Sequence, residues 1–209
     1  RTLYVASPLD EIVLGALAQV LSELCDGSLA PGLYSYRRGR SPHAAINAFC
    51  AHIRAHIRRR PDPRTRGLYV VRRDVRNFGE AIDASADSPL WSQLAAALRA
   101  ASLQPTAALM SWLQSAFRPA VETDLGELDR PERGIPTGSA LQPLACNLYL
   151  APLDRLGEAV PGGFYARYGD DVLFAHPDAA RAELSQRAID GLIESLALAP
   201  SPNKCGAYY

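Results

Sequence analysis

The chain of 209 residues carries 22 basic and 22 acidic residues, so its formal net charge is zero, and 48% of its residues are hydrophobic. This composition is ordinary for a soluble globular protein and excludes a disordered chain. No apolar run reaches the roughly 18 residues of a membrane-spanning helix, and the N-terminus lacks a signal-peptide pattern. The sequence therefore predicts a cytoplasmic protein with no membrane partner.

Helical periodicity and capping residues predict helices at 9–25, 42–59, 90–101, 106–117, 139–156 and 178–196. Short β-branched and aromatic runs predict strands at 68–71, 164–168 and 172–175, and a hairpin around Gly126 at 121–133. Ser41 followed by Pro42 is typical of the start of a helix, with the serine as N-cap.

Basic residues concentrate in one stretch, from Arg37 to Arg76. It holds twelve arginines and two acidic residues, a local formal charge of +10. A basic stretch inside a neutral chain is typical of a surface that neutralises nucleic-acid phosphates. A solvated arginine-rich helix and loop would have the same composition, so charge alone leaves both interpretations open.

Gly169-Asp170-Asp171 lies between the last two predicted strands, which is typical of a hairpin turn. Two adjacent carboxylates beside apolar strands are costly unless a cation pairs with them. A third carboxylate, Asp74, follows the strand predicted at 68–71. If these elements fold side by side, three aspartates surround a pair of Mg²⁺ ions, which prefer oxygen ligands and can promote nucleotidyl transfer. A plain Gly-Asp-Asp turn explains the same residues without a metal.

Five segments, in this order, resemble the sequence blocks of prokaryotic reverse transcriptases, particularly those of group II introns and their relatives. They are Tyr34-Ser-Tyr-Arg-Arg-Gly-Arg-Ser-Pro-His43, Asp74-Val-Arg-Asn-Phe78, Gly134-Ile-Pro-Thr-Gly-Ser139 continuing through Pro143, Asn147, Tyr149-Leu150 and Leu153-Asp154, Tyr168-Gly-Asp-Asp171, and Pro202-Asn203-Lys204. Each block is short, but together they extend the resemblance over nearly the whole chain.

The resemblance implies an α+β fold, the fingers–palm core of a right-hand polymerase with an antiparallel palm sheet backed by helices. Residues 1–66 would form basic, mostly helical fingers. Residues 67–209 would form the palm, with a helical insertion at about 88–118. The thumb is expected to be absent from this chain and to lie beyond Tyr209.

The activity implied by the resemblance is that of an RNA-directed DNA polymerase. It would transfer nucleotides from dNTPs onto a primer 3′-hydroxyl on an RNA template, using two Mg²⁺ ions for which Mn²⁺ can substitute. The implied partners are the RNA template, a DNA or RNA primer, dNTPs, and fused or associated components of an intron, a defence system or a CRISPR system. The implied location is the bacterial cytoplasm.

The resemblance also implies roles for single residues. The catalytic residues would be Asp74, Asp170 and Asp171, which would bind the metals together with the Val75 carbonyl. The nucleotide-binding residues would be Arg1, Phe78 as the steric gate against a 2′-hydroxyl, Thr137, Gly138, and Lys204 as proton donor. The template and primer would contact Arg37, Arg38, Arg40, Ser41 and Tyr168.

Three residues depart from the pattern of the family. Thr137 stands where many relatives carry glutamine, Gly79 replaces a phenylalanine after the gate, and Gln142 replaces a serine before Pro143. These departures indicate a divergent branch, such as one recruited for antiviral defence or CRISPR adaptation.

Other functions stay open at the level of sequence. A template-independent or protein-primed DNA polymerase of a defence system would carry the same carboxylates, and so would an RNA-dependent RNA polymerase. Outside the enzymes, an inactive palm could act as an RNA-binding scaffold.

Overall fold

The computed structural model describes residues 5–60, 62–122, 126–129 and 133–209. The chain divides into two compact units, a helical unit of Arg1–Leu29 and Asn77–Tyr149 and a sheet unit of Ala30–Arg76 and Leu150–Tyr209. The predicted fingers at 1–66 and palm at 67–209 have other boundaries, and that division stays a prediction.

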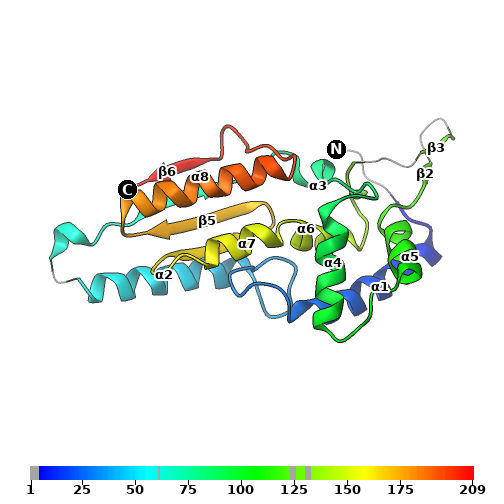
Figure 1. Cartoon of the computed structure of the whole chain (residues 1–209), viewed down its shortest axis with the longest axis horizontal. Helices are drawn as coiled ribbons and strands as arrows, with labels where there is room; N and C mark the ends of the chain where they lie inside the picture. Colours follow the sequence, from blue (N-terminus) through cyan, green and yellow to red (C-terminus); the bar gives the residue numbers. More distant parts are fainter. Residues whose placement is uncertain (1–4, 61, 123–125, 130–132) are drawn as a thin grey trace. The chain divides into compact units, whose positions relative to one another are not determined.

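The helical unit contains α1 (Pro8–Asp26), α3 (Phe78–Ala81), α4 (Pro89–Ala100), α5 (Ala107–Phe117), α6 (Gln142–Tyr149), and the paired strands β2 (Val121–Glu122) and β3 (Leu128–Asp129) (Figure 1). Helix α4 contacts α1, α5 and α6. Its fully buried Leu90, Leu94 and Leu98 recur every fourth residue, so they form one apolar stripe. This stripe makes α4 the centre of the core of the helical unit.

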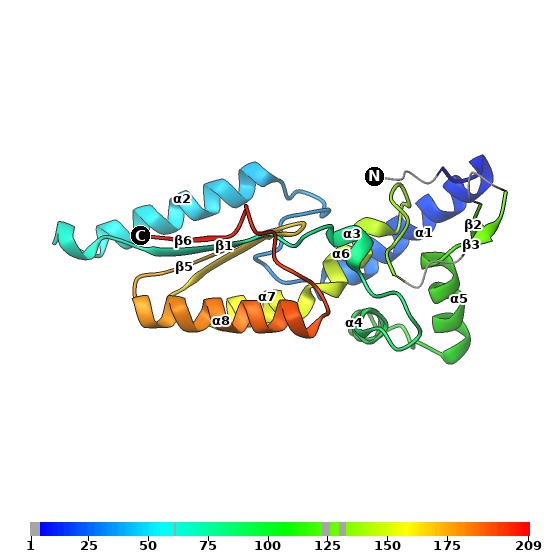
Figure 2. The same cartoon turned by 90° about the horizontal axis from the view of Figure 1, so that it is seen from above.

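The sheet unit contains α2 (Pro42–Arg58), the 3-10 helix η1 (Pro63–Thr65), α7 (Ala151–Glu158), α8 (Ala179–Ser195), and the strands β1 (Tyr69–Arg73), β4 (Phe164–Tyr168), β5 (Asp171–His176) and β6 (Gly206–Tyr208). The strands form one antiparallel sheet in the order β4-β5-β1-β6. Figure 2 shows these strands between α2 on one side and α7 and α8 on the other. The two sides are called the α2 face and the α7–α8 face.

Alternation along the strands assigns side chains to the two faces. On β4, the ring of Phe164 lies 5.1 Å from that of Phe49 of α2, whereas the hydroxyl of the next residue, Tyr165, donates to Asp154 of α7. On β1, Arg72 bonds to Asp171, whereas Arg73 bonds to α8. The α7–α8 face therefore holds the main core of this unit, with buried Val71, Tyr165, Val172 and Phe174.

Most predicted elements are confirmed within a few residues, including the N-cap of α2, where the Ser41 hydroxyl accepts a bond from the Ala44 amide at 3.1 Å. The single helix predicted at 139–156 is wrong, because the chain forms α6 and α7 with a break at Leu150. Pro152 lies in the first turn of α7, where a proline cannot continue the hydrogen bonding of a preceding helix. No helix in the described part of the chain has both the length and the apolar character to cross a bilayer.

Candidate active site

The three aspartates lie at one end of the sheet of the sheet unit. Arg73 of β1 pairs with Val172 of β5, so Asp74 and Asp171 each lie one residue beyond this pair, at the same end. Asp170 occupies the turn between β4 and β5, next to Gly169. Gly169 has φ of 64°, a conformation that glycine adopts without strain, so the turn can be tight. Strand pairing thus brings together residues almost a hundred positions apart.

Asp74 is a buried carboxylate, with 2% of the residue exposed. Its Oδ2 accepts a hydrogen bond from Lys204 Nζ at 2.9 Å. Its backbone carbonyl accepts a bond from the Ser201 amide at 2.7 Å, which fixes the 199–204 segment along the end of β1. This bond is one of two that form an antiparallel β-bridge between Val75 and Pro200. The other runs from the Arg76 amide to the Ala199 carbonyl, so the Val75 carbonyl takes no part in the bridge.

Asp171 is paired with a different cation. Arg72 donates from both Nε and Nη2 to Asp171 Oδ1, at 3.2 and 2.8 Å. About half of each side chain is exposed, at 45% for Arg72 and 46% for Asp171. This ion pair was missed at the level of sequence, although two adjacent arginines directly before Asp74 are visible there.

Asp170 has a raised pKa. Burial is the main cause, and the negative charges of Asp74 and Asp171 raise the pKa further, while Lys204 opposes the shift. The charges of Asp74 and Asp171 therefore act on Asp170. Such repulsion is typical of carboxylates that are grouped for a cation to bind.

The donor set of this group fits a hard divalent cation, because it consists of carboxylate oxygens. Among the described residues, however, no group of three or more His, Cys, Asp or Glu side chains is arranged to hold a metal ion as it stands. The cations of Lys204 and Arg72 occupy one oxygen each of Asp74 and Asp171. A metal can use both aspartates fully only after these contacts are exchanged.

A buried charge network holds the turn from the α7–α8 face. Arg167 is fully buried and donates to both oxygens of Asp154, at 2.6 and 2.7 Å. Tyr165 donates to the same carboxylate at 2.8 Å. Arg167 Nη1 also donates to the Gly169 carbonyl at 2.9 Å, inside the turn that carries Asp170. The network therefore connects α7, β4 and the turn.

The loop before α2 carries Arg37, Arg38 and Arg40 and is called the basic loop. It runs beside the turn of Gly169 and Asp170, which is called the aspartate turn. Leu33 forms a parallel bridge with Arg167, in which the Tyr34 amide bonds to the Arg167 carbonyl at 2.8 Å. The ring of Tyr36 lies 6.5 Å from that of Tyr168, and both rings are partly exposed. The basic loop and the aspartate turn thus form one surface of the sheet unit.

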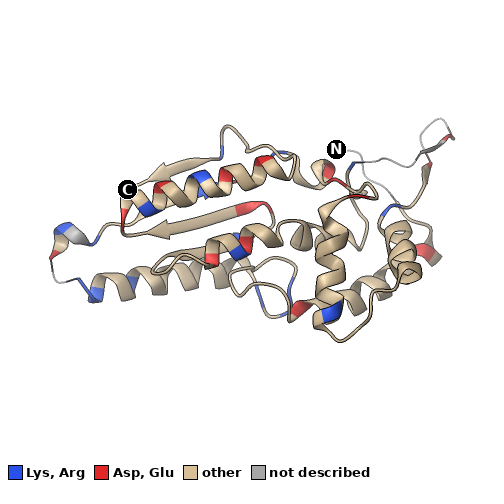
Figure 3. Ribbon diagram, in the orientation of Figure 1, with Lys and Arg blue, Asp and Glu red and all other residues tan. Residues whose placement is uncertain are grey.

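The arginines predicted to bind nucleic acid differ in their contacts. Arg37 donates to the Ala30 carbonyl at 2.7 Å, and Arg40 donates to the Pro31 carbonyl at 3.1 Å and lies over the Tyr34 ring. Arg38 is exposed, and Ser41 serves as the N-cap of α2. Figure 3 shows further basic residues at the end of α2 and in the segment that follows it.

The remaining predicted nucleotide-binding residues belong to the helical unit. Phe78 begins α3 and is buried, with its ring 6.5 Å from that of Tyr149. Thr137 is half-buried and Gly138 is exposed, in the loop before α6. Arg1 lies outside the described residues. The structure thus groups Asp74, Asp170, Asp171 and Lys204 in the sheet unit and places Phe78, Thr137 and Gly138 in the other.

Two of the departures from the family pattern fit each other. A Cβ atom at Gly79 would lie 2.5 Å from Nε2 of Gln142, so the glutamine fills the space beside the glycine. Gln142 Nε2 in turn donates to the Ile135 carbonyl at 3.3 Å. The replacement of a phenylalanine by glycine and that of a serine by glutamine therefore form a matched pair.

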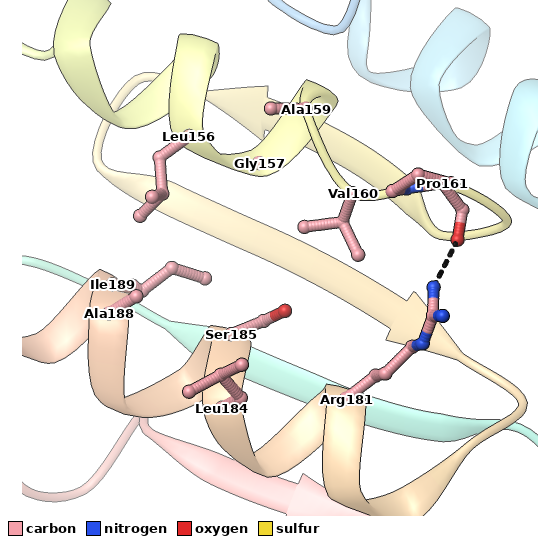
Figure 4. A pocket seen from close by; sticks show the side chains of 10 residues that line it. All are labelled: Leu156, Gly157, Ala159, Val160, Pro161, Arg181, Leu184, Ser185, Ala188 and Ile189. Carbon is pink, nitrogen blue, oxygen red and sulfur yellow. Dashed lines mark hydrogen bonds between the residues drawn. The ribbon is translucent and has the colours of Figure 1, made fainter.

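A cavity of about 310 Å³ lies between α8 and the end of α7 with the residues that follow it. Figure 4 shows Leu156, Val160 and Leu184 around it, with Arg181 bonded to the Pro161 carbonyl at 3.5 Å. Its lining is mainly apolar and includes none of the three aspartates. This cavity is therefore separate from the candidate active site.

The chain matches no protein-family model and no curated protein. It is similar in structure to telomerase from Candida albicans in complex with a fragment of telomeric RNA, at a TM-score of 0.66 and 14% identity, over 96% of this chain and 35% of that one. Two structures of telomerase from Candida tropicalis match at TM-scores of 0.65 and 0.64, with 12% and 11% identity, over 93% of this chain and 40% and 36% of theirs.

The chain thus spans well under half the length of these telomerases. Telomerase is a reverse transcriptase, and the likeness extends over nearly all of this chain. The predicted α+β fold, with an antiparallel sheet backed by helices, is confirmed. The chain has the fingers–palm fold of a polymerase of the reverse-transcriptase type.

Proposed function

We propose that the chain is the fingers–palm core of an RNA-directed DNA polymerase, which transfers nucleotides from dNTPs onto a primer 3′-hydroxyl on an RNA template. The observation that carries this proposal is the grouping of Asp74, Asp170 and Asp171 at one end of an antiparallel sheet, in a fold of the reverse-transcriptase type. A similar fold does not by itself imply the same activity, so the proposal depends on the arrangement of these site residues.

The three aspartates and the Val75 carbonyl would hold two Mg²⁺ ions, for which Mn²⁺ can substitute. When bound, such ions make a hydroxyl more acidic and stabilise the negative charge of an in-line phosphoryl displacement. The Arg167 bond to the Gly169 carbonyl supports this role, because it fixes the turn that presents Asp170.

Lys204 is the candidate proton donor. Its hydrogen bond to Asp74 raises its pKa, and the charges of all three aspartates act in the same direction, so the amine is protonated at neutral pH. A protonated amine beside the carboxylates can bind a triphosphate and donate a proton to the departing pyrophosphate. Release of Asp74 to a metal would leave the Lys204 ammonium available for that contact.

Nucleic acid would lie along the basic loop and the aspartate turn. Arg38, Tyr36 and Tyr168 are exposed on this surface, where a guanidinium can bind phosphate and rings can stack against bases or sugars. In the helical unit, Phe78 would act as the steric gate, and Thr137 and Gly138 would contact the incoming nucleotide. Arg1 would grip the triphosphate.

The branch proposed is the prokaryotic one of group II intron relatives, in a bacterial cytoplasm, with recruitment to defence or CRISPR adaptation. The matched Gly79 and Gln142 support a divergent nucleotide site. Fused or associated intron, defence or CRISPR components would then supply the physiological template.

A primer-extension assay with an RNA template, a DNA primer, dNTPs and Mg²⁺ tests the proposal. Wild-type protein should extend the primer, and Asp170→Ala should lower the rate about a thousandfold or more, because the metals lose a ligand. Glu183→Gln is a matched control, since Glu183 is an exposed carboxylate of α8 that pairs with Arg187. Its rate should stay within twofold of that of the wild type.

The same assay separates the alternatives. Extension by rNTPs in place of dNTPs would indicate an RNA polymerase, and extension without template would indicate a template-independent or protein-primed enzyme. RNA binding with no extension under any of these conditions would indicate an inactive scaffold. Equal activity of wild type and Asp170→Ala would contradict the assigned site.

A further inference from the structure

Two neighbouring arginines directly precede Asp74, and the sheet sends them to opposite faces. Arg73 reaches the α7–α8 face and donates to both oxygens of Asp190, at 2.5 and 2.9 Å. Arg72 reaches the α2 face, where both of its donors converge on Asp171 Oδ1. Arg72 lies outside the five blocks that carry the resemblance to reverse transcriptases, so that resemblance gives it no role.

We propose that Arg72 is a regulatory counter-ion of the active site, which holds Asp171 while the site is free of metal and so limits the entry of divalent cations. The inference rests on the proposed function and concerns the regulation of the same site. It makes Arg72 a positioning residue, because it acts on the metals through Asp171.

The charge balance of the site supports this role. When all three aspartates are ionised they contribute three negative charges, and Arg72 and Lys204, which contact two of them, contribute two positive ones. The group therefore carries a net charge of about −1, which attracts a divalent cation far less than three uncompensated carboxylates would. Loss of Arg72 alone would leave a net charge of about −2.

The ion pair of Arg72 and Asp171 can also separate easily, so that each partner binds another group. Arg72 and Asp171 are each about half exposed, so water can solvate both partners when they separate. Exposed ion pairs contribute little to stability, so breaking this one costs little. By contrast, the Arg73 side chain is only 7% exposed and its pair is part of the packed side of the sheet.

A triphosphate supplies the replacement partner for the guanidinium. Guanidinium groups bind phosphate oxygens in the same geometry in which they bind carboxylates. Metal and nucleotide arriving together would therefore exchange the partners of Arg72, with Asp171 passing to the metal and Arg72 to phosphate. The pair thus favours entry of the metal with its nucleotide over entry of free metal.

Manganese binding to the nucleotide-free protein tests the inference without reference to catalysis. Titrations followed by electron paramagnetic resonance of free Mn²⁺ would compare wild type with Arg72→Gln. The variant should bind Mn²⁺ about tenfold more tightly, because one positive charge near a divalent ion is removed. Arg187→Gln is the matched control, since Arg187 forms an exposed pair with Glu183 on α8, and it should leave the affinity within twofold of that of the wild type.

Equal Mn²⁺ affinities of wild type and Arg72→Gln, including an equal lack of binding up to millimolar Mn²⁺, would overturn the inference. An equal gain in Arg187→Gln would also overturn it, because the effect would then reflect net charge. Primer extension by the wild type separates this failure from failure of the proposed function. A wild type that extends a primer while Arg72→Gln shows no gain in affinity leaves the polymerase proposal standing.

Discussion

The two faces of the sheet hold their charges in different ways. On the α7–α8 face, Arg167 and Asp154 are almost fully buried, and the carboxylate also accepts a bond from Tyr165. On the α2 face, Arg72 and its partner Asp171 are 45% and 46% exposed. One face therefore carries a closed network, and the other carries contacts that solvent can reach.

The difference in exposure separates residues that support the structure of the site from residues that can take part in its chemistry. Removing one partner of a buried pair leaves an uncompensated charge, so a buried network holds one fixed arrangement. Exposed pairs are weak and screened, so their partners can be exchanged for metal or phosphate. Arg167 connects the buried network to the turn that carries Asp170, because it also donates to the Gly169 carbonyl.

The largest expected effect is on the buried network. Asp154→Asn leaves the buried Arg167 guanidinium without a negative partner, and should lower the free energy of unfolding by about 3–5 kcal/mol. Both tryptophans, Trp91 and Trp112, lie in the helical unit, so their fluorescence does not report this change directly. Hydrogen exchange of the β4 and β5 amides under native conditions measures it in the sheet unit.

A control and a second variant sharpen this test. Arg187→Gln removes an exposed pair and should change the free energy of unfolding measured by hydrogen exchange by no more than about 0.5 kcal/mol. The double variant Asp154→Leu with Arg167→Met should recover part of the stability, because no buried charge is left unpaired. A loss below about 1 kcal/mol in Asp154→Asn would mean that the network does not support the turn as described.

A smaller effect is expected from the two adjacent arginines. Arg73→Gln loses the bonds to Asp190 and a 3.3 Å bond to the Gly206 carbonyl of β6, and should cost about 1–3 kcal/mol. Arg72→Gln should cost less than about 1 kcal/mol, because its pair is exposed. Urea unfolding followed by near-ultraviolet circular dichroism of the tyrosines compares them. Equal losses would remove the distinction between the two faces.

The parts of the fold that local patterns determine could be predicted from sequence. The short β-branched and aromatic runs on either side of Gly169-Asp170-Asp171 predict the β4–β5 hairpin, and Ser41-Pro42 predicts the start of α2. Strand β6 was missed, because Gly206–Tyr208 has three residues and is defined only by pairing with β1, far away in the chain. Its existence depends on tertiary context that a short window does not contain.

In the candidate site, too, local sequence predicts some features and tertiary packing decides the others. The sequence predicts Asp74 at the end of a strand and Asp170 in a turn, and register then decides that they meet. The buried Arg167 was missed, although a charged residue inside an apolar strand requires a partner. Sequence can state that requirement, but many acidic residues could meet it, and only the packing of α7 selects Asp154.

The smallest expected effect is the pH dependence of stability that comes from Asp170, in the turn between β4 and β5. Its pKa is raised in the folded protein, mainly by burial and then by Asp74 and Asp171, so the folded state binds the proton more tightly than the unfolded state. The stability contributed by this group is therefore present in acid and lost as the pH rises through the raised pKa. At pH 7 in EDTA, Asp170→Asn should increase the free energy of unfolding by less than about 1 kcal/mol, since half-exposed groups are partly screened. Thermal unfolding between pH 4 and 7.5 should show the gain shrinking toward acid pH. A gain that is equal at both ends would mean that ionisation of Asp170 is not its cause, and the carboxylates would then not repel one another as the grouping requires.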